Sequence, residues 1–456
     1  MASDTRTGDG ARTLVVERRG VAPVPPGERH GRPFSQFTLW LGVNLTIADF
    51  ALGFLPIHLG LPWTWTVAAV AAGNALGAAA LASASAMGPA YGLPQMVLTR
   101  ATFGRAGARL PAGLNYLSTL GWFTVNTILG AFGMQILLPV TFWQGALILV
   151  AAQAALGIYG HNLVHVFERA IAVVLGLMFA AITGYVLTAT HALAAYRPAA
   201  PHPWPAFAIM VAAAISYVGS WSTYGADYSR YLPRSTPRRA VSGWVWLGAF
   251  LASAWLELLG TAVGVLAGPH APGITTAAHQ VIGAAAVAAI VLGALAANAA
   301  NVYSNSLSAA ALGIRAPRWV LAIAASAIGL GASLASSGRF EQAYQNFLLL
   351  LGYWFTGWLG VQVADFYLLR RRPPAAPATR RIGIPAIAAF CIAIGAEIPF
   401  MSSTLWTGWV ARSIGGADLA FYVGFTAAAL TYLILSSGAL QPARSGATGS
   451  RPARPH

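Results

Sequence analysis

Residues 36–58, QFTLWLGVNLTIADFALGFLPIH, form a predominantly apolar stretch that contains Asn44, Asp49 and Gly53. A helix needs about 20 apolar residues to cross the hydrocarbon core of a bilayer, so this stretch predicts a transmembrane span. A charge at bilayer depth costs at least a few kcal/mol, and such a residue is therefore usually functional or paired. The first span is thus expected to hold part of a polar site.

Eleven further stretches of this kind follow, at 63–87, 111–138, 143–159, 167–190, 204–224, 241–266, 281–307, 319–334, 344–369, 384–401 and 419–436. Hydrophobic residues make up 57% of the 456 residues and charged residues only 9%. Soluble domains carry about 25% charged residues, so a soluble protein is excluded. The sequence predicts an all-α integral membrane protein with about twelve transmembrane helices.

The arginines fix the expected orientation. With the N-terminus inside, 24 of the 27 basic residues fall on the inner side and only Arg197, Arg339 and Arg412 fall outside. Cytoplasmic loops hold the excess of Lys and Arg, so both termini are expected in the cytoplasm and the protein in the inner (plasma) membrane. The net charge of +15 then reflects topology and contact with anionic lipid. No basic soluble domain is present, so nucleic acid is not an expected partner.

The two tails, residues 1–35 and 441–456, are rich in Pro, Gly and Arg and are expected to be disordered. The transporter domain is expected to span residues 36–440. The single cysteine, Cys391, excludes a disulfide framework and a cysteine-based metal cluster, and no cofactor is expected.

Three acids fall within spans. Asp49 lies about fourteen residues into its helix and Glu257 also lies deep, so both are candidates for a group that carries a proton. The alternative for each is a structural bond that ties helices together. Glu397 is closer to the end of its span, and we expect it at the membrane interface.

Side-chain amides and one tryptophan form a second pattern. Amides occur within the spans at Asn44, Asn74, Asn126, Asn298 and Asn301. Trp122 and Asn126 are four residues apart and share one helix face, so an indole plate and an amide could hold a flat heteroaromatic ring. For any single amide, the alternative is helix–helix hydrogen bonding.

The first and sixth spans both carry polar, glycine-containing stretches. Asn44, Asp49 and Gly53 lie in the first, and Gly219 and Gly225 lie in or beside the sixth. Many transporters are built from two inverted repeats whose first helices are broken at the binding site. Repeats at about 36–193 and 204–369, with extra helices at about 384–436, would make these two spans equivalent. The alternative is close packing through small residues.

Several stretches carry a family resemblance: WLGVN (40–44), GPAYGLPQ (88–95) with RATFG (100–104), GWFTVN (121–126), WSTYGADYSRYLP (221–233), NVYS (301–304), GYW (352–354) and DFY (365–367). Over about residues 37–371, the chain resembles the purine/cytosine permeases of nucleobase–cation symporter family 1. The resemblance implies the LeuT-like fold of ten core helices in two halves, with two additional C-terminal helices. It also implies import of a nucleobase, cytosine or a purine, by cation symport through alternating access.

The resemblance assigns roles to individual positions. A tryptophan in the third span stacks on the base and a residue one turn later bonds it, which matches Trp122 and Asn126. An aromatic residue of the sixth span covers the other face of the base. Trp221 matches that position, with Tyr217 and Tyr224 as alternatives. Asn301 matches an asparagine that contacts the base edge, and the stretch around Asn44 would line the same cavity.

One departure concerns the coupling cation. Sodium-coupled relatives use hydroxyl side chains of the eighth span as ligands, whereas residues 281–302 contain no Ser or Thr, and Leu295 and Ala296 lie about where the hydroxyls would be. Proton coupling through Asp49 or Glu257 is therefore favoured, with sodium coupling as the alternative.

Other functions receive less support. A transporter of the same fold for allantoin or a hydantoin, pyridoxine or a thiamine precursor stays open, because stacking and edge recognition suit any such ring. An enzyme is not expected, since no nucleophile–base pair, metal cluster or phosphate loop is present. A channel is disfavoured because no filter motif occurs. The expected partners are a small heterocycle and the lipid bilayer, and the sequence leaves the oligomeric state open.

Overall fold

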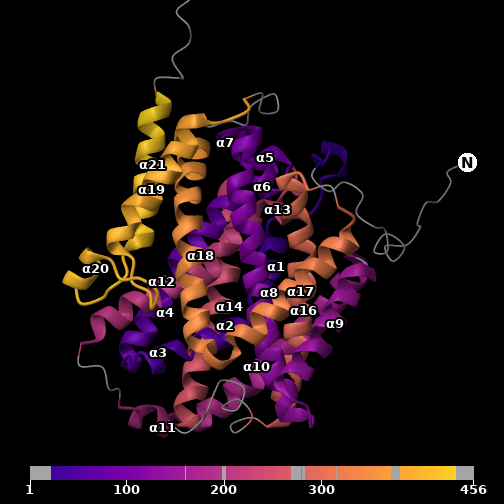
Figure 1. Ribbon diagram of the computed structural model, residues 1–456, viewed down its shortest axis with the longest axis vertical. Coiled ribbons are helices and arrows are strands. Elements are labelled where there is room, and N and C mark those ends of the chain that lie inside the picture. The colour runs from indigo at the N-terminus through magenta and orange to yellow at the C-terminus, as the bar shows by residue number, and fades with distance from the viewer. Residues whose placement is uncertain are drawn as a thin grey trace, which may run out of the picture.

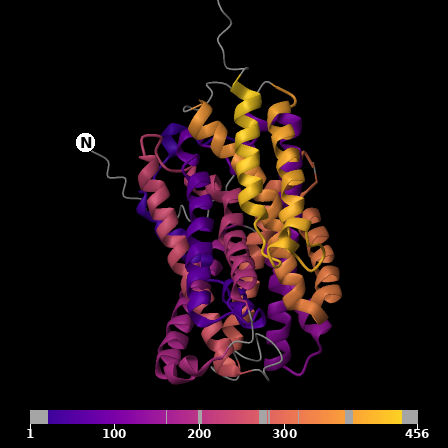
Figure 2. The same cartoon turned by 90° about the vertical axis from the view of Figure 1, so that its left-hand side faces the viewer.

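A computed structural model describes residues 22–159, 161–197, 202–268, 279, 283–314, 316–370 and 380–437. These residues are almost entirely helical, and the one isolated β-bridge among them joins Ser402 and Thr407. The long helices run roughly along one axis of the molecule, as Figures 1 and 2 show from two directions.

The first span is broken in its middle. It consists of α1 (Phe34–Asn44), α2 (Ile47–Leu52) and α3 (Leu55–His58), and the two parts on either side of the break are bent by 59°. At the break Thr46 has extended backbone angles (φ −126°, ψ 156°), and its N–H donates to Asn44 O rather than to a helical partner. The side chain of Thr46 caps α2 by accepting a bond from Asp49 N at 3.2 Å.

The sixth span is interrupted at the equivalent place. The long helix α12 (Pro203–Ser220) continues as the short 3-10 helix η2 (Trp221–Tyr224) and then as α13 (Gly225–Ser229). Residue Tyr224 (φ −123°, ψ −3°) leaves the helical region between them. The first helix of each expected repeat therefore departs from a regular α-helix, by a bend in the first span and by a 3-10 turn in the sixth.

The other helices of the two halves are continuous or joined by short turns. They are α4 (Trp63–Ser85), α5 (Gly88–Tyr91), α6 (Gln95–Leu98), α7 (Arg100–Gly107), α8 (Arg109–Leu137), α9 (Phe142–Tyr159), α10 (His161–Thr188), α11 (Thr190–Ala195), α14 (Arg238–Ala267), α16 (Ala284–Leu312), α17 (Arg318–Ser336), α18 (Phe340–Val363) and the π-helical turn η4 (Ala364–Arg370). After them come α19 (Ile384–Glu397), α20 (Trp409–Ser413) and α21 (Ala420–Ser437), and the remaining short 3-10 helices are η1 (Pro26–Glu28), η3 (Ser337–Arg339) and η5 (Ile398–Phe400).

The packing of these helices has an internal symmetry. Helix α1 packs against α14 as α12 packs against α4, which pairs the first span with the seventh and the sixth with the second. In the same way α9 packs on α16 as α17 packs on α8. Exchanging spans one to four for spans six to nine leaves this list of neighbours unchanged. The arrangement is the one expected from two repeats of five helices.

The described helices agree with the expected spans. Seven helical stretches are long and apolar enough to cross a membrane, and the bent pair of the first span makes an eighth. One of the seven, Trp319–Arg370, contains both α17 and α18, and three shorter apolar helices cover Phe142–Ala155, Ala284–Asn298 and Ile384–Phe400. Each of the twelve expected spans coincides with one of these stretches or with part of one.

Glu397, which we expect near the membrane interface, is enclosed by protein. Its side chain is fully buried where α19 meets α18 and α21, and Thr356 Oγ1 donates to its Oε1 at 3.3 Å. It occupies the space beside Gly424, where a Cβ atom would collide with the carboxyl group. Its sequence position near the helix end did not reveal this because η5 and α20 continue beyond it.

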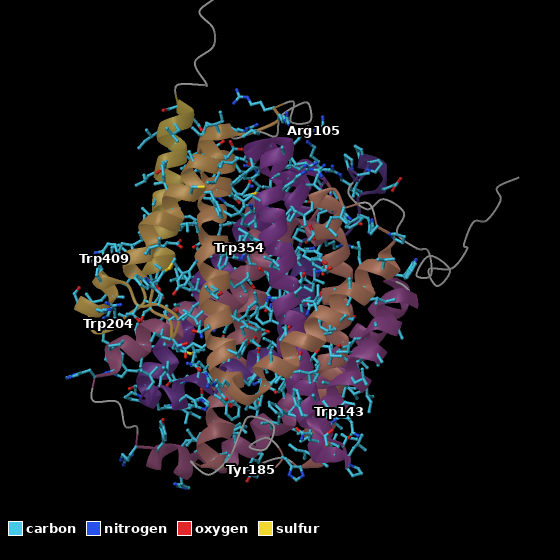
Figure 3. The ribbon with its side chains drawn as sticks, viewed as in Figure 1. Arg105, Trp143, Tyr185, Trp204, Trp354 and Trp409 are labelled. Carbon is cyan, nitrogen blue, oxygen red and sulfur yellow. The ribbon has the colours of Figure 1, made fainter. Side chains whose placement is uncertain are left out.

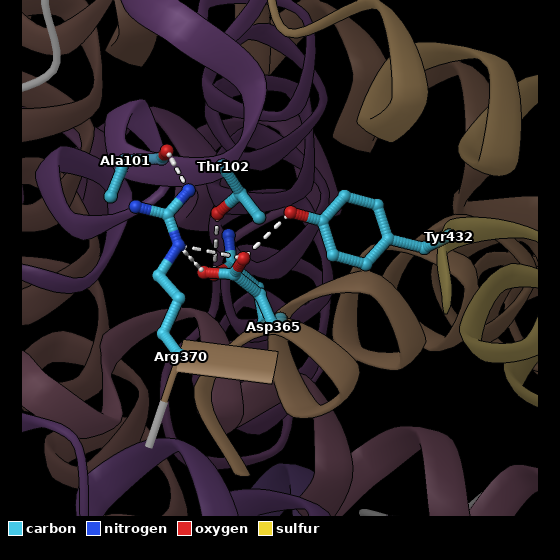
Figure 4. A network of polar contacts seen from close by, with 6 residues as sticks. Ala101, Thr102, Asp365, Arg370 and Tyr432 are labelled. Atoms are coloured by element: carbon cyan, nitrogen blue, oxygen red, sulfur yellow. Dashed lines mark hydrogen bonds and ion pairs between the residues drawn. The ribbon is translucent and has the colours of Figure 1, made fainter. Parts of the chain in front are cut away.

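The segments that follow the second and sixth spans lie at one end of the molecule, and residues 380–383 bond α7 there. Helices α5, α6, α7 and α13 lie there together, and Figure 3 shows Arg105 at this end and Trp143 and Tyr185 at the opposite end. At the same end Asp365 accepts from Arg370 Nε at 2.8 Å and from Tyr432 OH at 2.6 Å, while Arg370 also reaches Ala101 O (Figure 4).

Residues 22–33 differ from the expectation of a disordered tail up to residue 35. Val24 is buried and its N–H donates to Gly92 O at 2.9 Å, and His30 N donates to Tyr231 O at 2.6 Å. Arg29 Nη1 donates to Pro89 O at 2.7 Å. Residues 1–21 and 438–456, which include the whole predicted C-terminal tail, lie outside the described residues.

Candidate functional site

A cavity of about 540 Å³ lies at the two broken helices. It is bounded by α1 and α2, by α8 and α16, by the start of the described part of α10, and by α12 with η2 and α13. It reaches from Trp122 and Tyr217 in the middle of the helices to Ser35 and Thr38 near the beginning of α1. None of its lining residues is charged.

Trp122 lines the cavity and is surrounded by other aromatic rings. Its ring meets those of Tyr217, Phe347 and Tyr344 edge to face, with centroids 5.3, 5.0 and 6.3 Å apart. Tyr344 OH donates to Ala48 O at 2.8 Å and so ties α18 to α2. The indole of Trp122 lines the cavity from a position fixed on several sides, as the stacking role requires.

Asn126 lies one turn beyond Trp122 and lines the same cavity. Its Nδ2 donates to Trp122 O at 3.0 Å, and a carbonyl accepts only from the amide nitrogen, so the orientation of the amide is fixed. Its Oδ1 is buried and has no hydrogen-bond donor among the described residues. Asn126 therefore has an unused acceptor beside the cavity.

Asn301 lines the cavity from α16, and its amide, like that of Asn126, has its nitrogen bonded within the protein. Asn298 donates its Nδ2 to Phe123 O at 3.0 Å and to Thr127 Oγ1 at 3.1 Å, which leaves Asn298 Oδ1 to accept from Asn301 Nδ2 at 3.1 Å. The amide nitrogen of Asn301 is thus used within the protein, and its oxygen is the atom left for a ligand. Two of the predicted residues, from α8 and α16, come together as acceptors.

Trp221 and Tyr217 both line the cavity, and Tyr224 does not. Trp221 packs edge to face against Trp40 and Tyr224, at 6.0 and 5.8 Å between centroids. The sixth span therefore contributes the predicted residue Trp221 and one of its two alternatives.

Asn44 lies outside the cavity lining, although its neighbours Gly42 and Val43 are part of it. The side chain is fully buried and its Nδ2 donates to Trp40 O at 2.8 Å. In this structure Asn44 stabilises the end of α1, and its backbone carbonyl holds the break by accepting from Thr46 N at 2.9 Å.

Asp49 and Glu257 come together behind the cavity. Both are fully buried, and their carboxyl groups lie close enough to interact directly. Asn74 Nδ2 donates to Glu257 Oε2 at 2.9 Å, whereas both oxygens of Asp49 and Oε1 of Glu257 have no donor among the described residues. The hydroxyl of Ser253 faces Asp49 without making a bond of normal length.

Glycines allow the helices that carry these two acids to approach. A Cβ atom on Gly53 would lie 2.1 Å from Glu257 O, and one on Gly260 would lie 2.0 Å from Phe50 O. Thr261 Oγ1 donates to Gly53 O at 2.6 Å across the same contact. Because α2 and α14 touch through their backbones, the side chains of Asp49 and Glu257 are brought together beside this contact.

Sequence reasoning did not single out Thr46 or Tyr344. Thr46 lies at the helix break, lines the cavity and bonds the hydroxyl of Tyr217 at 2.6 Å. The spacing Thr46-x-x-Asp49 at the start of a helix is a capping-box pattern and could have indicated this break. Tyr344 carries no local signal, since only packing brings it over Ala48.

The residues that α16 contributes to the cavity wall are relevant to whether sodium is the coupling cation. The described residues of α16 in the cavity lining are Gly293, Ala296, Ala297 and Asn301, and none of these four carries a hydroxyl group. A sodium site built from hydroxyl oxygens would need such groups. Among the described residues no group of three or more His, Cys, Asp or Glu side chains suits a metal ion.

Comparisons with known proteins agree with this geometry. The family model described as "Permease for cytosine/purines, uracil, thiamine, allantoin" matches residues 23–425. The putative purine-cytosine permease YxlA of Bacillus subtilis is 28% identical, with 92% of this chain and 96% of the relative covered. The purine-cytosine permease fcyB of Emericella nidulans is 25% identical, with 93% and 89% covered.

A solved structure shows the same fold. MHP1, a nucleobase-cation-symport-1 family transporter, in a closed conformation with bromovinylhydantoin bound, superimposes with a TM-score of 0.73 at 20% identity, covering 93% of this chain and 95% of the other. The inverted-repeat arrangement and the motifs at both helix breaks agree with the match along almost the whole chain. The protein is a multi-pass membrane protein that belongs to the cytosine/purine, uracil, thiamine and allantoin permease family, and it is not an enzyme.

Proposed function

We propose that this protein imports a neutral nucleobase, cytosine or a purine, together with a proton by alternating access. The observation that carries the proposal is the joining of two sites at the broken helices. A cavity lined by an indole and two side-chain amides adjoins α2, and a buried pair of acids, one of them on α2, lies next to it.

The cavity supports a neutral, donor-rich heterocycle. Its volume of about 540 Å³ lies within the range of about 300–1,000 Å³ typical of small-molecule sites. A charged ligand would lose its hydration with no countercharge in the lining, which disfavours amino acids and cationic thiamine. Guanine presents N1–H and its amino group along one edge, whereas cytosine and adenine each present an amino group and a ring N–H on different edges; these donors suit the oxygens of Asn126 and Asn301.

Proton coupling is supported by the acid pair. Two carboxylates in contact inside a membrane cannot both stay ionised without a cation, and no basic group is among those that act on either of them. A shared proton would supply the donor that their unpartnered oxygens lack. The described residues of α16 in the cavity wall, which carry no hydroxyl, argue in the same direction.

The proposed orientation puts both termini and the cluster of arginine-bearing loops in the cytoplasm, with the protein in the plasma membrane. The cavity extends along α1 toward Ser35 and Thr38, near the segment that bonds the loops of this end. The arrangement therefore corresponds to a site that faces the cytoplasm and is covered on the outer side by α18.

Uptake of radiolabelled cytosine into proteoliposomes tests the proposal. Adenine, guanine, hypoxanthine, uracil, allantoin and pyridoxine serve as unlabelled competitors, and each assay is run with a proton gradient alone and a sodium gradient alone. We expect competition by one or more bases and accumulation driven by the proton gradient only. Sodium-driven accumulation would contradict proton coupling, and strong competition by allantoin or pyridoxine alone would move the substrate to those rings.

A further inference from the structure

The break in the first span contains a direct hydroxyl contact between the cavity and the acid pair. Tyr217 lines the cavity from α12, and its OH lies 2.6 Å from Thr46 Oγ1. The same Thr46 oxygen accepts from Asp49 N at 3.2 Å. One side chain therefore touches both the wall of the cavity and the helix turn that carries an acid.

We propose that the Thr46–Tyr217 hydroxyl contact is the positioning element that links substrate occupancy to protonation of the Asp49–Glu257 pair. The inference rests on the proton symport proposed above and assigns it a structural route. Neither hydroxyl is the proton carrier.

The contact is well placed to respond to a ligand. Tyr217 meets Trp122 edge to face at 5.3 Å, so a base stacked on the indole also contacts the Tyr217 ring. Movement of that ring changes the position of Thr46, which is the residue that ends the extended segment and caps α2. Because α2 is short and bent by 59° from α1, a shift of its cap shifts Asp49 with it.

The capping pattern is used in only one direction, which leaves the Asp49 carboxyl free to face Glu257. In a complete capping box the acid would accept from Thr46 N, but that N–H donates to Asn44 O instead. The Asp49 oxygens have no donor among the described residues, so the position of α2 decides how closely they approach Glu257. A change at the cap therefore changes the affinity of the pair for a proton.

The groups that face the pair from the surrounding helices are known. Among the described residues, Tyr217 from α12 and Tyr344 from α18 are the titratable groups besides the two acids, and Ser253 and Asn74 from α14 and α4 are neutral. Both tyrosines donate or share hydrogen bonds through their hydroxyls, with Thr46 and Ala48 O respectively. The two acids are thus the groups whose protonation the contact influences.

Tyr217→Phe and Thr46→Val test the link, since each removes one hydroxyl and retains most of the volume. Two readouts are needed: exchange of labelled for unlabelled base without a gradient, and accumulation under a gradient of one pH unit. We expect exchange to persist in both variants. Their KM should stay within about tenfold of the wild-type value, because each variant loses only one hydrogen bond. Accumulation should fall from about tenfold to below about twofold, because coupling is lost.

Controls separate this role from a structural one. Thr46→Ser keeps the hydroxyl and should restore accumulation and its pH profile. Thr66→Val removes a buried hydroxyl that bonds only Pro62 O in its own helix, and it should behave as wild type. If Tyr217→Phe fails to insert, the Thr46 variants decide the question alone.

The outcomes distinguish the two levels of the proposal. If wild type shows no proton-driven accumulation of any base, proton symport itself fails. If wild type accumulates base and both hydroxyl variants still reach the same accumulation with an unchanged pH profile, the link is refuted while symport stands. A slower variant that still reaches full accumulation also refutes it, since coupling would then be intact.

Discussion

Replacement of Glu257 by Gln is the most direct perturbation of the acid pair. Glu257 does not line the cavity, and the amide oxygen of Gln can still accept the bond that Asn74 Nδ2 makes at 2.9 Å. The amide nitrogen supplies a permanent donor to Asp49 in place of the shared proton. The variant should therefore fold, bind base and exchange it, but no longer bind a transportable proton.

The structure sets the size of the expected effect. If the acid pair shares one transportable proton, as proposed, one proton moves with each base. One pH unit is worth 1.36 kcal/mol, so wild type should accumulate base about tenfold per unit of gradient. Without a transported proton, the pH gradient cannot drive accumulation. In Glu257→Gln the base should therefore reach equal concentrations inside and outside the vesicles, a ratio of about one.

Steady-state accumulation in proteoliposomes with a clamped pH gradient measures this ratio, and gradient-free exchange verifies that the variant is active. Glu397→Gln is the matched control, because it makes the same chemical change at a fully buried acid bonded to Thr356 and away from the cavity. Unchanged tenfold accumulation in Glu257→Gln would refute the assignment of the pair. Accumulation near a hundredfold in wild type would refute a single shared proton.

Trp122→Ala removes the indole on which the base stacks and should raise KM by roughly 5- to 150-fold, since base–aromatic stacking is worth about 1–3 kcal/mol. Protein levels in the membrane should stay normal. Initial-rate uptake measures KM, and a wild-type value would contradict the stacking role. Asn301→Ala should raise KM on the order of 10–100-fold from the loss of a ligand hydrogen bond, and equal KM values for all bases before and after the change would count against Asn301 as a ligand. Gly260→Ala places a Cβ 2.0 Å from Phe50 O and should destabilise the protein by about 1–3 kcal/mol, measured as a lower Tm in detergent. Gly243→Ala, which has open space around it, should leave Tm unchanged. An unaltered Tm for both variants would show that α2 and α14 can separate without loss of stability.

Much of the fold follows from composition and periodicity. The twelve apolar stretches and the arginine asymmetry require only that backbone polar groups be satisfied inside the bilayer and that charge stay out of it. These rules apply to each segment separately, so a span can be predicted without knowing which helices pack against it. The break in the first span is also partly local, because Thr46 and Asp49 have the spacing of a helix start.

The candidate site could be predicted only in part. Trp122 and Asn126 share a helix face, so their cooperation is visible from spacing alone, and Asn301 and Trp221 came from the family resemblance. Asn44 fits the same reasoning, yet it turns away and bonds Trp40 O. Which side of a helix faces a cavity depends on the partner helices, and no local pattern records it.

The sequence by itself determined that this chain crosses a membrane repeatedly and which residue types are available for a flat ligand and a coupling ion, while the orientation of its loops stays a prediction. Tertiary structure decided which of those residues meet. Asp49 and Glu257 are 208 positions apart, and they become one buried pair only because Gly53 and Gly260 let α2 and α14 touch. The polarity of Asn126 and Asn301 likewise depends on hydrogen bonds already used within the fold. Such properties arise from contacts between distant segments, and the free energy of a contact is not encoded in either segment alone.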